Sequence, residues 1–148
     1  MNASLKWPLL TAAVLVFLDQ WLKIWIKTSF ALGESYPITS WFQLHFTENP
    51  GMAFGMEWGG IAGKYALSSF RILAIGGILW YMRRLAQGGA TPFVLISFGI
   101  VLAGALGNVV DSLFYGLLFD RGLTYSAEYS DWMMYTGVAE WGSGYAPM

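Results

Sequence analysis

The sequence predicts an all-α integral membrane protein, and composition carries most of that prediction. Hydrophobic residues make up 56% of the 148 residues and charged residues only 11%, whereas a soluble domain is roughly 25% charged. An aromatic content of 18% adds more apolar surface than so short a chain can bury. The net charge of −1 gives no basic surface for nucleic acid, and the absence of cysteine excludes a disulfide scaffold and thiol catalysis.

Three apolar runs are long enough to cross a bilayer as helices. The first is flanked by Lys6 and Lys27 and lacks the small-residue cleavage site of a secretory signal, so we expect it to be retained. The third contains Gly99 and Gly104, which allow close helix contact. The expected spans are at about residues 7–26, 65–82 and 92–107.

The charge distribution predicts the orientation of a single membrane domain covering residues 1–148. Arg83 and Arg84 follow the second span directly and mark the cytoplasmic side, which places the N-terminus inside. Residues 28–60 and 108–148 are then outside. Within the first of these segments, residues 42–46 alternate between apolar and polar side chains, a pattern that predicts a short strand on the membrane surface.

Two groups of polar residues in the first 60 positions are candidates for a site. Asp19 and Lys23 are four residues apart on the first span and share a helix face, so they shape a site or form a structural ion pair. Asn49 and Gly51 lie in a stretch rich in glycine, which either builds a binding turn or is an ordinary turn beside the membrane.

A third candidate group closes the third span. Asn108 and Asp111 line one face if the helix continues past residue 107. Gly104 and Gly107 would let another helix or a peptide approach closely. Simple helix packing with a polar end is the alternative. A carboxylate and an amide at membrane depth favour a functional role.

Asp111 and Asp120 are candidate catalytic carboxylates, and the chain has no serine-nucleophile motif and no metal-ligand pattern. Asp120 follows Asp111 by nine residues. Two carboxylates that share a proton supply a base and an acid together, although this separation does not show that the two meet. His45, the one histidine, alternates within the predicted strand and is expected to be structural.

Three motifs together resemble those of lipoprotein signal peptidase (signal peptidase II), a family of bacterial inner-membrane aspartyl proteases. Their order and their positions at the outer ends of spans agree with that family, over about residues 15–116. The motifs are Asp19-Gln20-x-x-Lys23, Asn49-x-Gly51-x-Ala53-Phe54-Gly55 and Gly104-Ala105-Leu106-Gly107-Asn108-x-x-Asp111-x-x-x-x-Gly116.

The resemblance implies a fold and an activity. It implies four membrane helices with both termini in the cytoplasm, and a small β-cradle on the periplasmic side. It implies removal of signal peptides from lipid-modified prolipoproteins by cleavage just before the diacylglyceryl-cysteine. Two aspartates perform this chemistry, with no cofactor. The partners implied are the prolipoprotein and membrane lipids, and a monomer is expected.

The chain also departs from the family pattern. The Asn-x-Ala-Asp pattern of the second catalytic aspartate does not occur, and a fourth span is missing. Asp120 is the candidate for the first aspartate, but residues 121–148 resemble an aromatic-rich insertion of one branch, in which that aspartate follows the insertion. We therefore expect a C-terminally incomplete peptidase, inactive by itself. The alternative is a non-enzymatic membrane protein that binds lipid or lipopeptide on the same outer platform.

Overall fold

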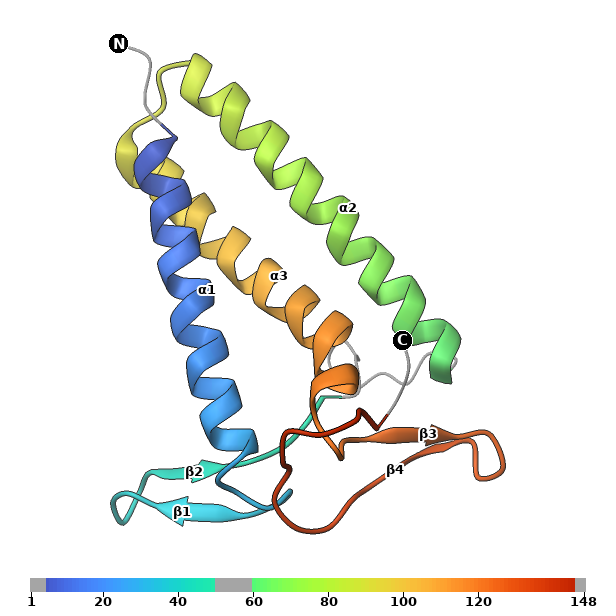
Figure 1. The fold of residues 1–148 in the computed structure, drawn as a ribbon. Coiled ribbons are helices and arrows are strands. Elements are labelled where there is room, and N and C mark those ends of the chain that lie inside the picture. Colours follow the sequence, from blue (N-terminus) through green and yellow to red (C-terminus); the bar gives the residue numbers. More distant parts are fainter. Residues whose placement is uncertain (1–4, 50–59, 146–148) are drawn as a thin grey trace. The chain divides into compact units, whose positions relative to one another are not determined.

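The computed structural model of the protein describes residues 5–49 and 60–145, which form long helices and two small sheets (Figure 1). The chain divides into two compact units. Unit 1 comprises Met1–Trp21 and Ser68–Asp111, and unit 2 comprises Leu22–Leu67 and Ser112–Met148. The elements are α1 (Lys6–Lys27), β1 (Ser35–Pro37), β2 (Gln43–His45), α2 (Gly60–Gln87), α3 (Pro92–Leu118), β3 (Thr124–Ser126) and β4 (Asp131–Met133).

All three expected spans are helices, and each is long and apolar enough to cross a membrane. Within the described residues we find these three and not a fourth. The helices α2 and α3 extend beyond the second and third expected spans, and α3 continues through residues 108–118. No proline interrupts residues 108–118, and apolar residues continue along them, so the helical hydrogen bonds persist. The helix ends where the amide of Asp120 instead donates to the carbonyl oxygen of Glu140 at 2.9 Å.

Unit 1 is held together by small and apolar side chains from all three helices. Its buried core comprises Ala12 of α1, Met82 of α2, and Leu102 and Ala103 of α3. At Gly99 a Cβ atom would lie 2.5 Å from the carbonyl oxygen of Pro8, so the backbones of α1 and α3 touch there. The close contact predicted for Gly99 is therefore confirmed, whereas a Cβ atom at Gly104, the other glycine for which close helix contact was predicted, would meet no atom within 4 Å.

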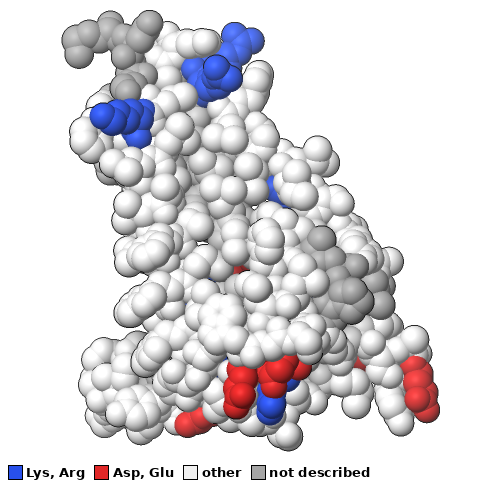
Figure 2. All heavy atoms as spheres, viewed as in Figure 1, with Lys and Arg blue, Asp and Glu red and all other residues white. Residues whose placement is uncertain are grey.

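The outer surface of unit 1 is apolar along its length and basic at one end. Large side chains such as Phe17, Leu73 and Phe93 are exposed, as expected for helices that face lipid. Lysine and arginine side chains gather where α1 begins and α2 ends (Figure 2). Such an end is typical of the cytoplasmic side of a membrane protein.

Unit 2 contains two antiparallel hairpins. β1 pairs with β2 in the register Ser35↔His45 and Tyr36↔Leu44, which confirms the strand predicted from the alternating pattern. Ser35 Oγ and His45 Nδ1 are 2.8 Å apart across this hairpin. The second hairpin pairs β3 with β4 in the register Thr124↔Met133 and Tyr125↔Trp132, and lies within residues 121–148, which resemble an aromatic-rich insertion and for which no strand is predicted.

The segment after α3 folds back onto the end of that helix. Phe119 forms a β-bridge with Trp141, and their rings stack with centroids 4.8 Å apart. The amides of Gly142 and Tyr145 donate to the carbonyl oxygens of Leu118 and Gly116 at 3.0 Å each. We call residues 121–145 the return segment, because it packs against the helix end it has just left.

Candidate functional site

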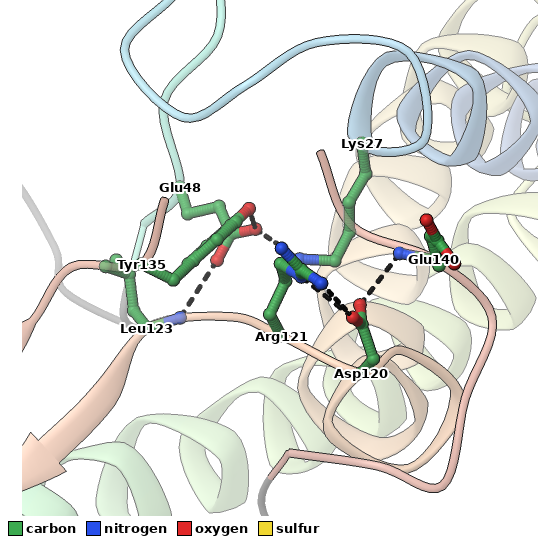
Figure 3. A network of polar contacts seen from close by, with 7 residues as sticks. All are labelled: Lys27, Glu48, Asp120, Arg121, Leu123, Tyr135 and Glu140. Carbon is green, nitrogen blue, oxygen red and sulfur yellow. Dashed lines mark hydrogen bonds and ion pairs between the residues drawn. The ribbon is translucent and has the colours of Figure 1, made fainter. Parts of the chain in front are cut away.

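Unit 2 contains a buried cluster of charged and aromatic side chains (Figure 3). Lys27, the last residue of α1, is only 3% exposed. Burying an ammonium group is costly unless it is paired, and Lys27 forms an ion pair with Glu48. Lys27 thus ends the first span, as predicted, and is also buried in an ion pair, which the sequence did not indicate.

Glu48 is fixed through both carboxylate oxygens. Oε1 contacts Lys27 and accepts a 2.6 Å hydrogen bond from the hydroxyl of Tyr135. Oε2 accepts a 3.2 Å hydrogen bond from the amide of Leu123. Hydrogen bonds that involve an ionised partner are stronger than neutral ones. Glu48 therefore joins three separate stretches of unit 2, namely the end of α1, the stretch after β2 and the return segment.

Aromatic rings surround the ammonium group of Lys27. Its Nζ lies 5.2 Å from the ring centroids of Phe119 and Tyr135, and 5.5 Å from that of Tyr145. Rings within about 6 Å attract a cation through their electron-rich faces. The ion pair is mostly shielded from solvent, since the side chains of Lys27 and Glu48 are 3% and 16% exposed, and this shielding strengthens the attraction between them.

The two tyrosines of this cluster remain protonated well above neutral pH. Burial raises the pKa of Tyr135 far above its ordinary value, and the hydrogen bond to Glu48 raises it further. Burial, with a smaller contribution from the charge of Glu48, raises the pKa of Tyr145 to about 12. Tyr135 is therefore a permanent hydrogen-bond donor to Glu48 at physiological pH.

Asp120, the predicted catalytic aspartate, lies beside the cluster in a set of hydrogen bonds of its own. Its Oδ2 accepts from Nε of Arg121 at 2.8 Å and pairs with Nη2 at 2.6 Å. Its Oδ1 accepts from the amide of Glu140 at 2.7 Å. The hydrogen bonds from Arg121 and from Glu140 lower the pKa of Asp120 below its ordinary value. The carboxylate is thus held ionised, and it is a weaker base than an ordinary carboxylate because these bonds stabilise its charged form.

Unit 1 gathers a second polar group, around the side-chain amide of Gln20. Its Nε2 lies 2.8 Å from Oδ1 of Asp111, 3.1 Å from Oδ2 of Asp19 and 3.3 Å from the carbonyl oxygen of Gly107. Arg71 of α2 interacts electrostatically with Asp111. Three of the predicted site residues therefore meet across α1 and α3. Gln20 and Arg71 were not among the predicted site residues, although polar side chains at membrane depth are themselves a signal of function.

The other predicted site residues are divided between the two units or lie outside the described residues. Asn108 lies one helical turn before Asp111 on α3, because the helix continues as the shared-face prediction required. A Cβ atom at Gly104 would meet no atom within 4 Å, so its surface is open within the structure. Lys23 and Asn49 belong to unit 2. Gly51 lies outside the described residues. A single pocket that unites all these residues stays a prediction.

Sequence reasoning missed the importance of Lys27, Glu48 and Tyr135. Glu48 directly precedes the Asn49 motif, which was the one available signal. Its partners are 21 and 87 residues away in the chain, at spacings that no local periodicity reveals. Across residues 5–49 and 60–145, no three histidine or acidic side chains come together in a way that could hold a metal ion.

Comparison with known proteins identifies the family. The family model described as signal peptidase (SPase) II matches residues 11–138. The lipoprotein signal peptidase of Porphyromonas gingivalis is 43% identical over 107 residues, which cover 72% of this chain and 46% of the relative. That of Rhodopseudomonas palustris is 33% identical over 118 residues, which cover 78% of this chain and 70% of the relative.

A further relative has the same partial coverage. The lipoprotein signal peptidase of Amoebophilus asiaticus is 38% identical over 109 residues, covering 71% of this chain and 46% of the relative. The chain thus spans about half the length of its Porphyromonas and Amoebophilus relatives. No solved structure matches it significantly. With the family model covering most of its length, the chain belongs to the signal peptidase II family of aspartic-type lipoprotein signal peptidases.

Proposed function

We propose that the protein to which these 148 residues belong removes signal peptides from lipid-modified prolipoproteins, by cleavage just before the diacylglyceryl-cysteine. The match of the signal peptidase II family model to residues 11–138 carries this proposal. Three helices that could cross a membrane support it. The polar group around Gln20 also supports it, because carboxylates and amides at membrane depth serve a site more often than they serve packing.

The chemistry follows from the available side chains. Peptide hydrolysis without a serine, cysteine or metal needs a water molecule that a carboxylate activates. A second, protonated carboxyl group must then donate a proton to the leaving amine. Asp120 is our candidate for the base, because it is the carboxylate that follows the Gly116 motif in the chain. We place the acid in the part of the relatives' length that these 148 residues do not span.

The other predicted site residues are proposed to bind and shape. The side-chain amide of Gln20 lies within hydrogen-bond distance of Asp19, Gly107 and Asp111. Asn108 lies on the same helix as Asp111. Such groups can hold the polar backbone of a substrate at the membrane interface, while its acyl chains lie between helices. Lys23, Asn49, Gly51 and Gly104 complete the proposed set.

The test compares two lengths of the protein in membranes that lack an endogenous enzyme. We expect the complete reading frame to cleave a lipid-modified prolipoprotein, and residues 1–148 alone to leave it intact, because one carboxylate cannot serve as base and acid together. Failure of the complete protein to cleave would contradict the proposed activity. Cleavage by residues 1–148, abolished by Asp120→Asn, would contradict the proposed division of the catalytic pair.

A further inference from the structure

We propose that Glu48 is a positioning residue of the peptidase, which fixes the neighbouring Asn49 by tying it to Lys27 and to the return segment. This role rests on the proposed function, because Asn49 begins a motif of the proposed site. Glu48 is not itself proposed to touch the substrate. The proposal concerns only residues of unit 2 (Figure 3).

Glu48 directly precedes Asn49, the residue that it is proposed to position. Consecutive Cα atoms are about 3.8 Å apart, so a change in the backbone at Glu48 moves Asn49 directly. The carboxylate of Glu48 is anchored by Lys27, by the hydroxyl of Tyr135 at 2.6 Å and by the amide of Leu123 at 3.2 Å. Three anchors, one from the end of α1 and two from the return segment, restrict this backbone.

The anchors of Glu48 are themselves held by other contacts. Lys27 is 3% exposed and lies over the rings of Phe119, Tyr135 and Tyr145. The return segment is fastened in turn, since the amide of Tyr145 donates to the carbonyl oxygen of Gly116 at 3.0 Å. Glu48 is therefore bound to fixed points.

The ion pair between Lys27 and Glu48 contributes to positioning more than to stability. A buried ion pair adds little net stability, because a neutral pair of similar shape often stabilises a fold equally well. The geometry of an ion pair is more specific than that of an apolar contact, because both charged groups must lie in one arrangement. Two of the anchors of Glu48, the Tyr135 hydroxyl and the Leu123 amide, come from the return segment. The return segment thereby acts on Asn49 through Glu48.

The experiment uses the complete protein in detergent with a lipid-modified prolipoprotein peptide. It compares Lys27→Met, Glu48→Gln and the double variant at a temperature at which each is folded. We expect Lys27→Met to lower Tm by leaving a buried carboxylate unpaired, and the double variant to regain Tm because both charges are gone. The kcat of the double variant should nevertheless stay at least tenfold below that of the unmodified protein, and its KM should stay within threefold. The reason is that a misplaced Asn49 impairs the chemical step.

Two further variants complete the test. Tyr135→Phe keeps the ring over Lys27 and deletes one hydroxyl, and we expect its kcat to fall severalfold. Glu128→Gln, at an exposed position of the β3–β4 turn, is the matched control and should leave kcat unchanged. Recovery of kcat together with Tm in the double variant, or an unchanged kcat in Tyr135→Phe, would overturn the positioning role. An inactive unmodified protein would instead contradict the proposed function on which this role depends.

Discussion

The hydroxyl of Tyr135 donates a 2.6 Å hydrogen bond to Oε1 of Glu48, although 87 residues separate the two in the chain. Because Glu48 also holds Lys27 at the end of α1, this single bond joins the return segment to the first helix. The aromatic-rich segment after α3 is consequently part of the packed structure of unit 2. Its contacts account for most of the polar interactions in the cluster of Figure 3.

Titration of the tyrosines tests the burial of this cluster. The raised pKa of Tyr145, about 12 against an ordinary value of 10.0, means that the folded state prefers the neutral phenol. The contribution of Tyr145 to the free energy of unfolding is therefore fully present below pH 10 and is lost as the pH rises through 12. We expect an ultraviolet titration to show a late phenolate component near pH 12 that Tyr145→Phe removes. A late component of equal size in Tyr145→Phe would show that Tyr145 is not buried as described.

The acid side of the stability profile tests the hydrogen bonds of Asp120. Its pKa is lowered from the ordinary 3.8 by Arg121 and by the amide of Glu140. It therefore contributes stability that is complete above pH 3.8 and is lost as the pH falls through the lower folded-state pKa. We expect the free energy of unfolding to fall less between pH 5 and pH 2 in Asp120→Asn than in the unmodified protein. The matched variant Asp131→Asn should retain the larger fall, and an equal fall in both variants would contradict the assignment.

Two glycines of α3 form a matched pair for testing the helix contact in unit 1. A methyl group at Gly99 would lie 2.5 Å from the carbonyl oxygen of Pro8, whereas one at Gly104 would meet no atom within 4 Å. Overpacking of this kind costs about 1–3 kcal/mol. We expect Gly99→Ala to lower the free energy of unfolding in detergent by that amount. Gly104→Ala should leave it unchanged or slightly higher, and equal effects of the two substitutions would refute a close contact at Gly99.

The orientation in the membrane can be tested with single cysteines, because the 148 residues contain none. Arg83 and Arg84 near the end of α2 predict a cytoplasmic position for that end. We expect a membrane-impermeant thiol reagent to label Ser40→Cys, in the β1–β2 turn, in intact cells. Gln87→Cys should react only after the cells are opened. The opposite pattern of labelling would reverse the proposed orientation.

Several features of the protein were determined by the sequence itself. Three apolar runs predicted three helices, and all three are present, because the length and polarity of a run decide locally whether it can cross a bilayer. The alternation around Leu44 predicted a strand, since a period of two is a local property of extended backbone. The three motifs identified the family, and the family model covers residues 11–138.

Other features were decided only by tertiary structure. The helix α3 ends at Leu118. The amide of Asp120 no longer donates to a carbonyl oxygen of the helix and donates instead to that of Glu140, 20 residues further along the chain. The pairing of Lys27, Glu48 and Tyr135 likewise depends on the path by which the return segment comes back to the end of α1. Sequence periodicity reports which residues share a face of one element. It carries no information about which distant segment will cover that face, and the burial that gives these charges and phenols their chemistry exists only after the segments have met.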